Sequence, residues 1–265
     1  MGKLFFLIAS LFFVSNLTAQ EKTKSKKEER KENRKIRIDA LIKQEEEGVI
    51  VNKKHFLGGI KLNTDGYGVF AEKGLAKSVN KSLLFQLEIS ERKHRKENKQ
   101  FNNQNGAGPY LYGKINFFYP VKLGVQQQFL LGNKGNKNGL SLSANIGGGL
   151  TLGVLRPYQL AYDSAGMQIF RGLGNSTKDS ARFLNQPPLS GPNFGTGFNK
   201  STLVPGAYTK AGVRFDYGKF NEVISAIEVG LCAEFYSKKI PQMVFSKDKN
   251  FFFSAYVSFL FGKRK

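Results

Sequence analysis

The clearest pattern in the chain is an alternation of apolar residues with small or polar residues at a period of two. It is longest between Asn250 and Phe261, NFFFSAYVSFLF, where Phe, Ala and Val occupy one face and Ser254, Tyr256 and Ser258 occupy the other. Successive side chains of a β-strand point to opposite faces. A long strand that is apolar on one face, with aromatic residues at its ends, is typical of a wall between lipid and a packed lumen.

The same alternation recurs in segments that are separated by clusters rich in Gly and Asn, which favour turns. We therefore expect eight strands, at about residues 57–72, 81–94, 109–117, 120–132, 139–156, 203–218, 222–237 and 249–262. The expected fold is all-β, an antiparallel up-and-down transmembrane β-barrel. Pro120 marks either a turn or a bulge, and the segment after Arg156 has room for another hairpin, which would make ten strands.

Opposite the apolar faces, several strands carry charged residues that would point into the lumen. They are Lys61, Asp65, Glu88, Arg92, Lys114, Lys122, Lys210, Arg214, Asp216, Glu228 and Glu234. The strand at 139–156 offers only Ser, Asn, Thr and Gly on this face, which leaves space for long side chains. Because side chains just fill an eight-stranded barrel, we expect the charges to pair in a buried network. Such a network plugs the barrel; a proton or ion pathway along it is the less favoured alternative.

The first twenty residues resemble a secretory signal. Lys3 precedes the apolar run LFFLIASLFFV, and Ala19 precedes Gln20, so we expect cleavage after Ala19. The run is shorter than the roughly 20 residues of a spanning helix. With 24 Phe, 10 Tyr, 29 Gly and a mean hydropathy of −0.34, the composition favours an outer-membrane barrel over a soluble exported protein. We expect a signal peptide at 1–19, a charged periplasmic tail at 20–48 and the barrel at 49–265, with both termini periplasmic.

The tail, Glu21 to Glu47, is rich in Lys and Glu and has no apolar residue before Ile36. Its first half cannot bury a core, whereas its second half could form a short helix with Ile38, Leu41 and Ile42 on one side. A tether is the simpler interpretation. The alternative is a docking helix for a periplasmic partner or for the barrel mouth.

The net charge of +21 is spread along the chain without a nucleic-acid-binding motif, so we expect no nucleic-acid partner. Basic loops beside anionic lipid head groups explain the excess better. Cys232 is the single cysteine of the chain, which excludes an internal disulfide. We interpret it as a small residue that faces the lumen.

No catalytic, cofactor or metal site is expected. Neither His55 nor His94 has a Ser or Asp at a spacing that suggests a triad, and no His, Cys or Asp cluster has metal-ligand spacing. Small outer-membrane barrels do include lipid hydrolases with a His/Ser pair at the rim. Either histidine with a nearby serine such as Ser90 would imitate one, and this is the alternative function.

The connection from Arg156 to Thr202 is long for a compact fold and carries several aromatic residues. Strand parity places it on the extracellular side, together with Ser237 to Lys249. It would form either a self-packed cap over the barrel or a surface that binds a partner. The aromatic residues are Tyr158, Tyr162, Phe170, Phe183, Phe194 and Phe198.

The stretches EEEGVIVNKKHFLGGIKLNTDGYGVFAEKG, YLYGKINFFYPVKLG and GNKGNKNG, the last followed by GGGLTLGVLRPYQL, resemble a family of small outer-membrane β-barrel proteins from Bacteroidota. The resemblance runs from about Glu45 to Phe261 and implies a barrel of about eight strands in the outer membrane. The family has no established reaction, so it implies no functional residue. A looser similarity in size links it to barrel accessory subunits of secretion and gliding machinery. We therefore expect a non-enzymatic anchor or accessory subunit that contacts outer-membrane lipids and an envelope protein.

Overall fold

A computed structural model describes residues 26–46, 54–100, 109–133, 139–164, 167–172, 181, 185, 191–192, 195–218, 223–244 and 246–264. The expected signal peptide lies outside these residues. By its contacts the chain divides into two units, Met1–Lys43 and Gln44–Lys265, which are described separately.

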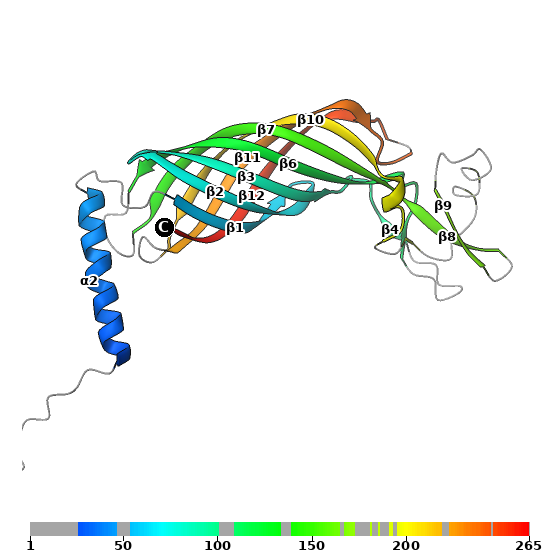
Figure 1. Ribbon diagram of the computed structural model, residues 1–265. Helices are drawn as coiled ribbons and strands as arrows, with labels where there is room; N and C mark the ends of the chain where they lie inside the picture. The colour runs from blue at the N-terminus through cyan, green and yellow to red at the C-terminus, as the bar shows by residue number, and fades with distance from the viewer. Residues whose placement is uncertain are drawn as a thin grey trace, which may run out of the picture. The chain divides into compact units, whose positions relative to one another are not determined.

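Eight antiparallel strands form a closed up-and-down barrel, in which the last strand pairs with the first (Figure 1). This confirms the expected fold class and strand number. The strands are β1 (Lys54–Asn63), β2 (Gly66–Ser78), β3 (Lys81–Arg92), β6 (Asn116–Gly132), β7 (Ser141–Pro157), β10 (Thr202–Asp216), β11 (Val223–Ile240) and β12 (Lys249–Arg264). Closure leaves no free sheet edge, so every strand has a hydrogen-bonded neighbour on both sides.

The expected strand boundaries were wrong at two places. One expected strand is two strands and two expected strands are one, so the total of eight is unchanged. The segment 57–72 is not one strand, because Thr64 and Asp65 form a two-residue turn between Asn63 and Gly66 and reverse the chain into β2. Conversely, 109–117 and 120–132 do not form two strands. Pro120 lies within β6, opposite Gly153 of β7, at the point where pairing with β3 breaks off between Val121 and Phe118. A proline fits there because it has no N–H to donate.

The two ends of the barrel differ in the length of their connections. At the end where β1 begins and β12 finishes, here called the terminal end, the described strands are joined by connections within residues 79–80, 133–140 and 217–222. The opposite end, here called the loop end, carries the long connections 93–115 and 158–201 and the shorter 241–248. Both long connections belong to one end.

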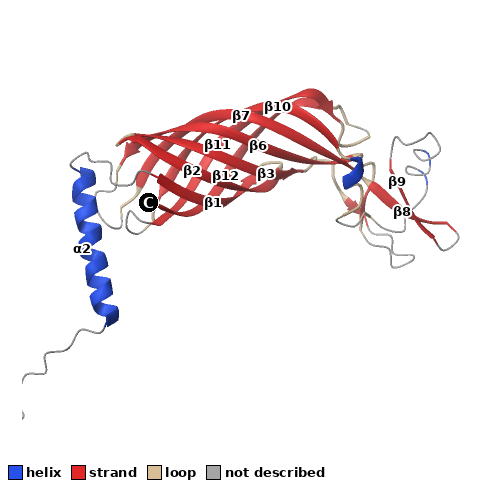
Figure 2. Ribbon diagram, in the orientation of Figure 1, coloured by secondary structure: helices blue, strands red, loops and turns tan. Residues whose placement is uncertain are grey.

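The loop-end connections contain small elements of their own. They are β4 (Lys99–Gln100), β5 (Tyr110–Leu111), β8 (Gln159–Ser164), β9 (Met167–Gly172) and the 3-10 turn η1 (Phe198–Lys200). The extra hairpin that the sequence left open after Arg156 exists as β8 and β9. It forms a separate two-stranded sheet and does not enter the barrel (Figure 2).

The described residues near the N-terminus form the helix α2 (Lys26–Glu46), which begins earlier than the short helix expected in the second half of the tail. Glu28 and Glu29 lie in its first turn, where the helix dipole favours negative charge. The side chains of Ile38, Leu41 and Ile42 lie outside the described set. Among the described residues, no helix combines the length and the apolar character needed to cross a membrane.

The outer surface of the barrel is apolar. Alternate residues of each strand point outward, and large aliphatic and aromatic side chains are exposed all around the wall, up to 73% for Leu150. A soluble protein rarely leaves a continuous apolar surface of this extent, whereas a closed barrel in lipid requires one. These exposed residues include Phe85, Leu87, Ile89, Leu123, Val125, Ile146, Val229, Leu231, Phe253, Val257 and Phe259. The fold is therefore that of a transmembrane β-barrel.

Candidate functional site

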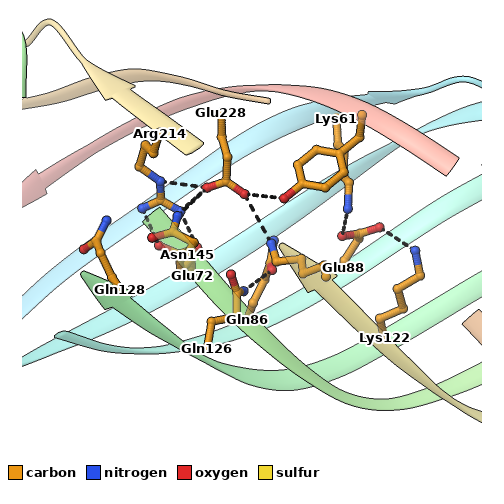
Figure 3. A network of polar contacts seen from close by, with 12 residues as sticks. Lys61, Glu72, Gln86, Glu88, Lys122, Gln126, Gln128, Asn145, Arg214 and Glu228 are labelled. Carbon is orange, nitrogen blue, oxygen red and sulfur yellow. Dashed lines mark hydrogen bonds and ion pairs between the residues drawn. The ribbon is translucent and has the colours of Figure 1, made fainter. Parts of the chain in front are cut away.

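The lumen contains a group of ion pairs centred on Arg214 (Figure 3). The guanidinium of Arg214 donates to both carboxylate oxygens of Glu72, at 2.8 and 2.9 Å, and its Nε donates to Glu228 at 2.8 Å. Glu228 also accepts hydrogen bonds from Asn145 at 2.7 Å and from the Tyr256 hydroxyl at 2.8 Å. All five side chains are buried. The bidentate arrangement fixes three strands, β2, β10 and β11, relative to one another.

A second group lies nearer the loop end and contains two shared carboxylates. Lys61 and Lys122 donate to the two oxygens of Glu88, at 2.8 and 2.9 Å. Lys122 also lies 2.7 Å from Glu234, which accepts a hydrogen bond from Arg92 at 2.8 Å. Each lysine or arginine in this group therefore has a carboxylate within hydrogen-bond distance.

The described lumen is balanced in charge. A fifth cation, Lys210, lies 3.5 Å from Glu228, and Asp65 in the turn after β1 lies 3.1 Å from Arg92. Five cations thus face five carboxylates: Lys61, Arg92, Lys122, Lys210 and Arg214 against Asp65, Glu72, Glu88, Glu228 and Glu234. Pairing is required because burial of an isolated charge costs several kcal/mol of folding free energy. Removal of one partner from a buried pair lowers stability by about 3 to 5 kcal/mol.

Apolar clusters lie at both ends of the network. Toward the terminal end the cluster consists of Leu57, Phe70, Ile224, Ala226 and Leu260. Toward the loop end it consists of Phe118, Leu155, Val204, Tyr236 and Ile240, with Phe252 packed against it. The rings of Phe118, Tyr236 and Phe252 contact one another with centroids 5.3 to 5.9 Å apart. An ion in the lumen would therefore meet two apolar clusters and a network of paired charges.

The small residues of β7 make room for aromatic side chains. We expected the space opposite this strand to hold long charged side chains. A Cβ added at Gly153 would lie 2.8 Å from the Phe118 ring and 3.0 Å from the Tyr236 ring. Cys232 is also buried, in a cluster with Tyr208 and Tyr256.

The structure places two of the expected lumen residues outside the network. Lys114 lies before β6, in the long connection, and donates to Glu97 at 2.8 Å; burial lowers the pKa of its ammonium group. Asp216 pairs at 2.9 Å with Arg264 at the terminal end. The alternation pattern did not predict Glu72 as a lumen residue, because the overlooked turn shifts the phase of the residues that follow it.

Of the two histidines, His94 has a serine partner. Its Nε2 lies 3.0 Å from the Ser246 hydroxyl, in a pocket of about 410 Å³ at the loop end. The sequence pattern did not point to Ser246. Ser90, the serine expected as a possible partner, donates instead to the carbonyl of Pro120 at 3.4 Å. His55 lies on β1, with its Nε2 3.8 Å from Glu72.

The hydrogen bonds of His94 fix its tautomer. The backbone N–H of Lys96 donates to Nδ1 at 3.2 Å, so in the neutral ring the proton is on Nε2, and Ser246 accepts it. Burial lowers the pKa of His94 and so disfavours the doubly protonated ring. A general base for Ser246 would need the opposite arrangement, with Nε2 unprotonated and a carboxylate or amide oxygen on Nδ1.

Among the described residues there is no group of three or more His, Cys, Asp or Glu side chains that could hold a metal ion.

No protein-family model matches the sequence, and no curated protein matches it. Solved structures of similar architecture exist. The N-terminal β-barrel domain of Pseudomonas aeruginosa OprF is 9% identical over 80% of this chain and 98% of that domain, with a TM-score of 0.35. Neisserial surface protein A is 11% identical over 80% and 95%, with a TM-score of 0.35. Ail, the attachment invasion locus protein of Yersinia pestis, is 10% identical over 81% and 99%, with a TM-score of 0.37. At these identities nothing about activity passes from those proteins to this chain.

Proposed function

We propose that the chain is a non-enzymatic outer-membrane barrel that serves as an anchor or accessory subunit of a cell-envelope assembly. One observation carries this proposal: the lumen is filled by charge-balanced ion pairs and closed by apolar clusters at both ends. A lumen filled by side chains in this way leaves the exposed segments of the described chain as the surfaces for contacts.

The surface of the barrel supports the proposed location. A closed antiparallel barrel with an apolar exterior is stable in a bilayer, and single-chain barrels of this kind occupy outer membranes with short turns in the periplasm and long loops outside. By this rule the terminal end is periplasmic and the loop end extracellular. The segment that contains α2 would then extend into the periplasm.

Two segments are candidates for partner contacts. One is the helix α2, whose described side chains are exposed. The other is the layer at the loop end, in which Tyr158 and Leu160 pack against Tyr110, Leu111 and Phe117. This packing, together with the hydrogen bond from the Leu111 N–H to the Tyr158 hydroxyl at 2.7 Å, joins the two long connections.

Deletion of each segment tests the proposal. One variant lacks residues 26–46, and a second lacks the hairpin tip 162–170; neither deletion removes a barrel strand. Both variants should remain membrane-inserted and heat-modifiable on gels. At least one should lose the envelope proteins that cross-link to the intact protein in cells. Unchanged cross-linking in both variants would refute the assignment of function to these segments.

A rim-located lipid hydrolase is the second candidate, because His94 and Ser246 lie within hydrogen-bond distance in a rim pocket. Comparison of outer-membrane lipids from cells with the intact protein and with Ser246→Ala decides between the two. If the protein is a non-enzymatic anchor, the lipid profiles of the two kinds of cells should be identical. Accumulation of an uncleaved lipid in the variant would establish the hydrolase.

A further inference from the structure

We propose that the rim pocket at the loop end binds the phosphorylated head group of a membrane lipid. The pocket of about 410 Å³ has the size of small-molecule sites. Four segments line it: the turn after β1, the residues that follow β3, the connection between β11 and β12, and the start of β12.

Cationic residues outnumber acidic ones in the lining. The cations are Arg92, Lys93, Arg95, Lys96, Lys247 and Lys249, and the acids are Asp65 and Asp248. Asp65 is paired with Arg92 at 3.1 Å, and with six cations against two acids the lining keeps a net positive charge. A concave site with this excess of one sign attracts anions. The ligand should therefore be anionic.

The hydrogen bonds of Arg92 give an independent indication of an anionic ligand. Its side chain is only 4% exposed, and its Nε and Nη2 point to Asp65 and Glu234. The remaining nitrogen, Nη1, is buried and has no hydrogen-bond partner among the described residues. An unpaired buried donor is unfavourable. A phosphate oxygen is a suitable partner for it, because guanidinium groups bind phosphate through directed hydrogen bonds.

The pocket borders the lipid-facing wall of the barrel. Phe251 and Phe253 both line it and are 54% and 61% exposed on the outward face of β12. An amphiphile could place its head group on the cations and its chains along these rings. A free phosphate ion would use the cations alone. We therefore assign the site to a lipid.

Calorimetric titration of the full chain in non-ionic detergent tests this assignment. The probes are dihexanoyl phosphatidic acid, which has a terminal phosphate, dihexanoyl phosphatidylcholine, which has no net charge, and inorganic phosphate. Phosphatidic acid should bind at least about tenfold more tightly than either of the others at low salt.

Two triple variants of equal charge change separate the pocket from general electrostatics. Arg95→Gln/Lys247→Gln/Lys249→Gln removes three exposed cations of the pocket. Lys73→Gln/Lys77→Gln/Lys81→Gln removes three exposed cations from β2 and β3, away from the loop end. The first should weaken binding of phosphatidic acid about tenfold or more, and the second less than about twofold.

Three outcomes would overturn the proposal. Equal affinity for the two lipids would exclude recognition of phosphate. An equal loss of affinity for phosphatidic acid in both triple variants would show that binding depends on the net charge of the protein and not on the pocket. Binding of inorganic phosphate as tight as that of phosphatidic acid would mean that the site takes the free ion and that the phenylalanines do not contribute.

Discussion

At the scale of single residues, Arg214 is the clearest example of how the lumen is stabilised. It donates to Glu72 and Glu228 from one buried guanidinium, so its removal leaves two carboxylates with reduced compensation. Arg214→Met should lower the free energy of unfolding by about 3 to 5 kcal/mol, measured by urea titration in lipid vesicles.

The matched control for this substitution is Arg264→Met. Arg264 also pairs with an aspartate, Asp216, but its side chain is 24% exposed at the terminal end. Solvent screening makes such a pair weak, so the loss should stay below about 1 kcal/mol. Equal losses in the two variants would show that the Arg214 ion pairs do not stabilise the folded barrel.

The outward face makes a different prediction. Val229 lies opposite Val213 and Val257 in the neighbouring strands and is exposed, near the middle of the wall. Val229→Arg should cost about 2 to 4 kcal/mol because the charge enters the bilayer midplane. Leu203→Arg, at the start of β10, should cost less than about 1 kcal/mol because it lies near the interface. The reverse ranking in vesicle refolding would contradict the assignment of faces.

At the scale of elements, the connections at the loop end contain a pH-sensitive contact. Burial lowers the pKa of His94 from 6.5, and nearby Lys249 and Lys96 act in the same direction while Glu97 opposes them. The folded state therefore binds fewer protons than the unfolded state below pH 6.5, so stability falls as pH falls through that window. The denaturation midpoint of the intact protein should decrease there.

His94→Gln is the control for this titration, since glutamine has no titrating group. Its midpoint should fall less over the same pH range than that of the intact protein. Identical pH profiles for the two proteins would show that His94 does not contribute to the pH dependence.

The sequence predicts the strand faces well and the turns poorly. Alternation in β7, β11 and β12 has one phase throughout, so the outward residues follow directly from the pattern. The turn at Thr64 and Asp65 was missed because alternation is present on both sides of it, and the change of phase between the two segments was overlooked. The dipeptide Asp65–Gly66 was the available signal, since Asp-Gly favours tight hairpins.

The missed turn explains the omission of Glu72 from the expected network. In an unbroken strand, Glu72 falls on the face opposite Lys61, whereas in β2 it points inward with Gly68 and Phe70. Lys114 was misplaced for a related reason: a strand was assumed before Pro120, although β6 starts only at Asn116. The pairing of particular charges could not be predicted, because it depends on the register between strands that are far apart in sequence.

At the scale of the whole molecule, the barrel combines an apolar exterior with a polar interior in which cationic side chains pair with carboxylates. The ion pairs join strands across the lumen, β2 to β11 through Arg214 on β10 and β3 to β11 through Lys122 on β6. The small residues of β7 admit the aromatic rings that close the loop end. Rigidity and closure of the lumen are therefore two results of the same packing.

Conductance in planar bilayers tests the central claim of a closed lumen most directly. The full chain, reconstituted from detergent and checked for folding by heat-modifiability, should produce no stable stepwise current at any applied voltage that the bilayer tolerates. The reason for this expectation is that paired charges and two apolar clusters fill the described part of the lumen. Steady open-channel currents of uniform size would contradict the account and show that the barrel is a pore.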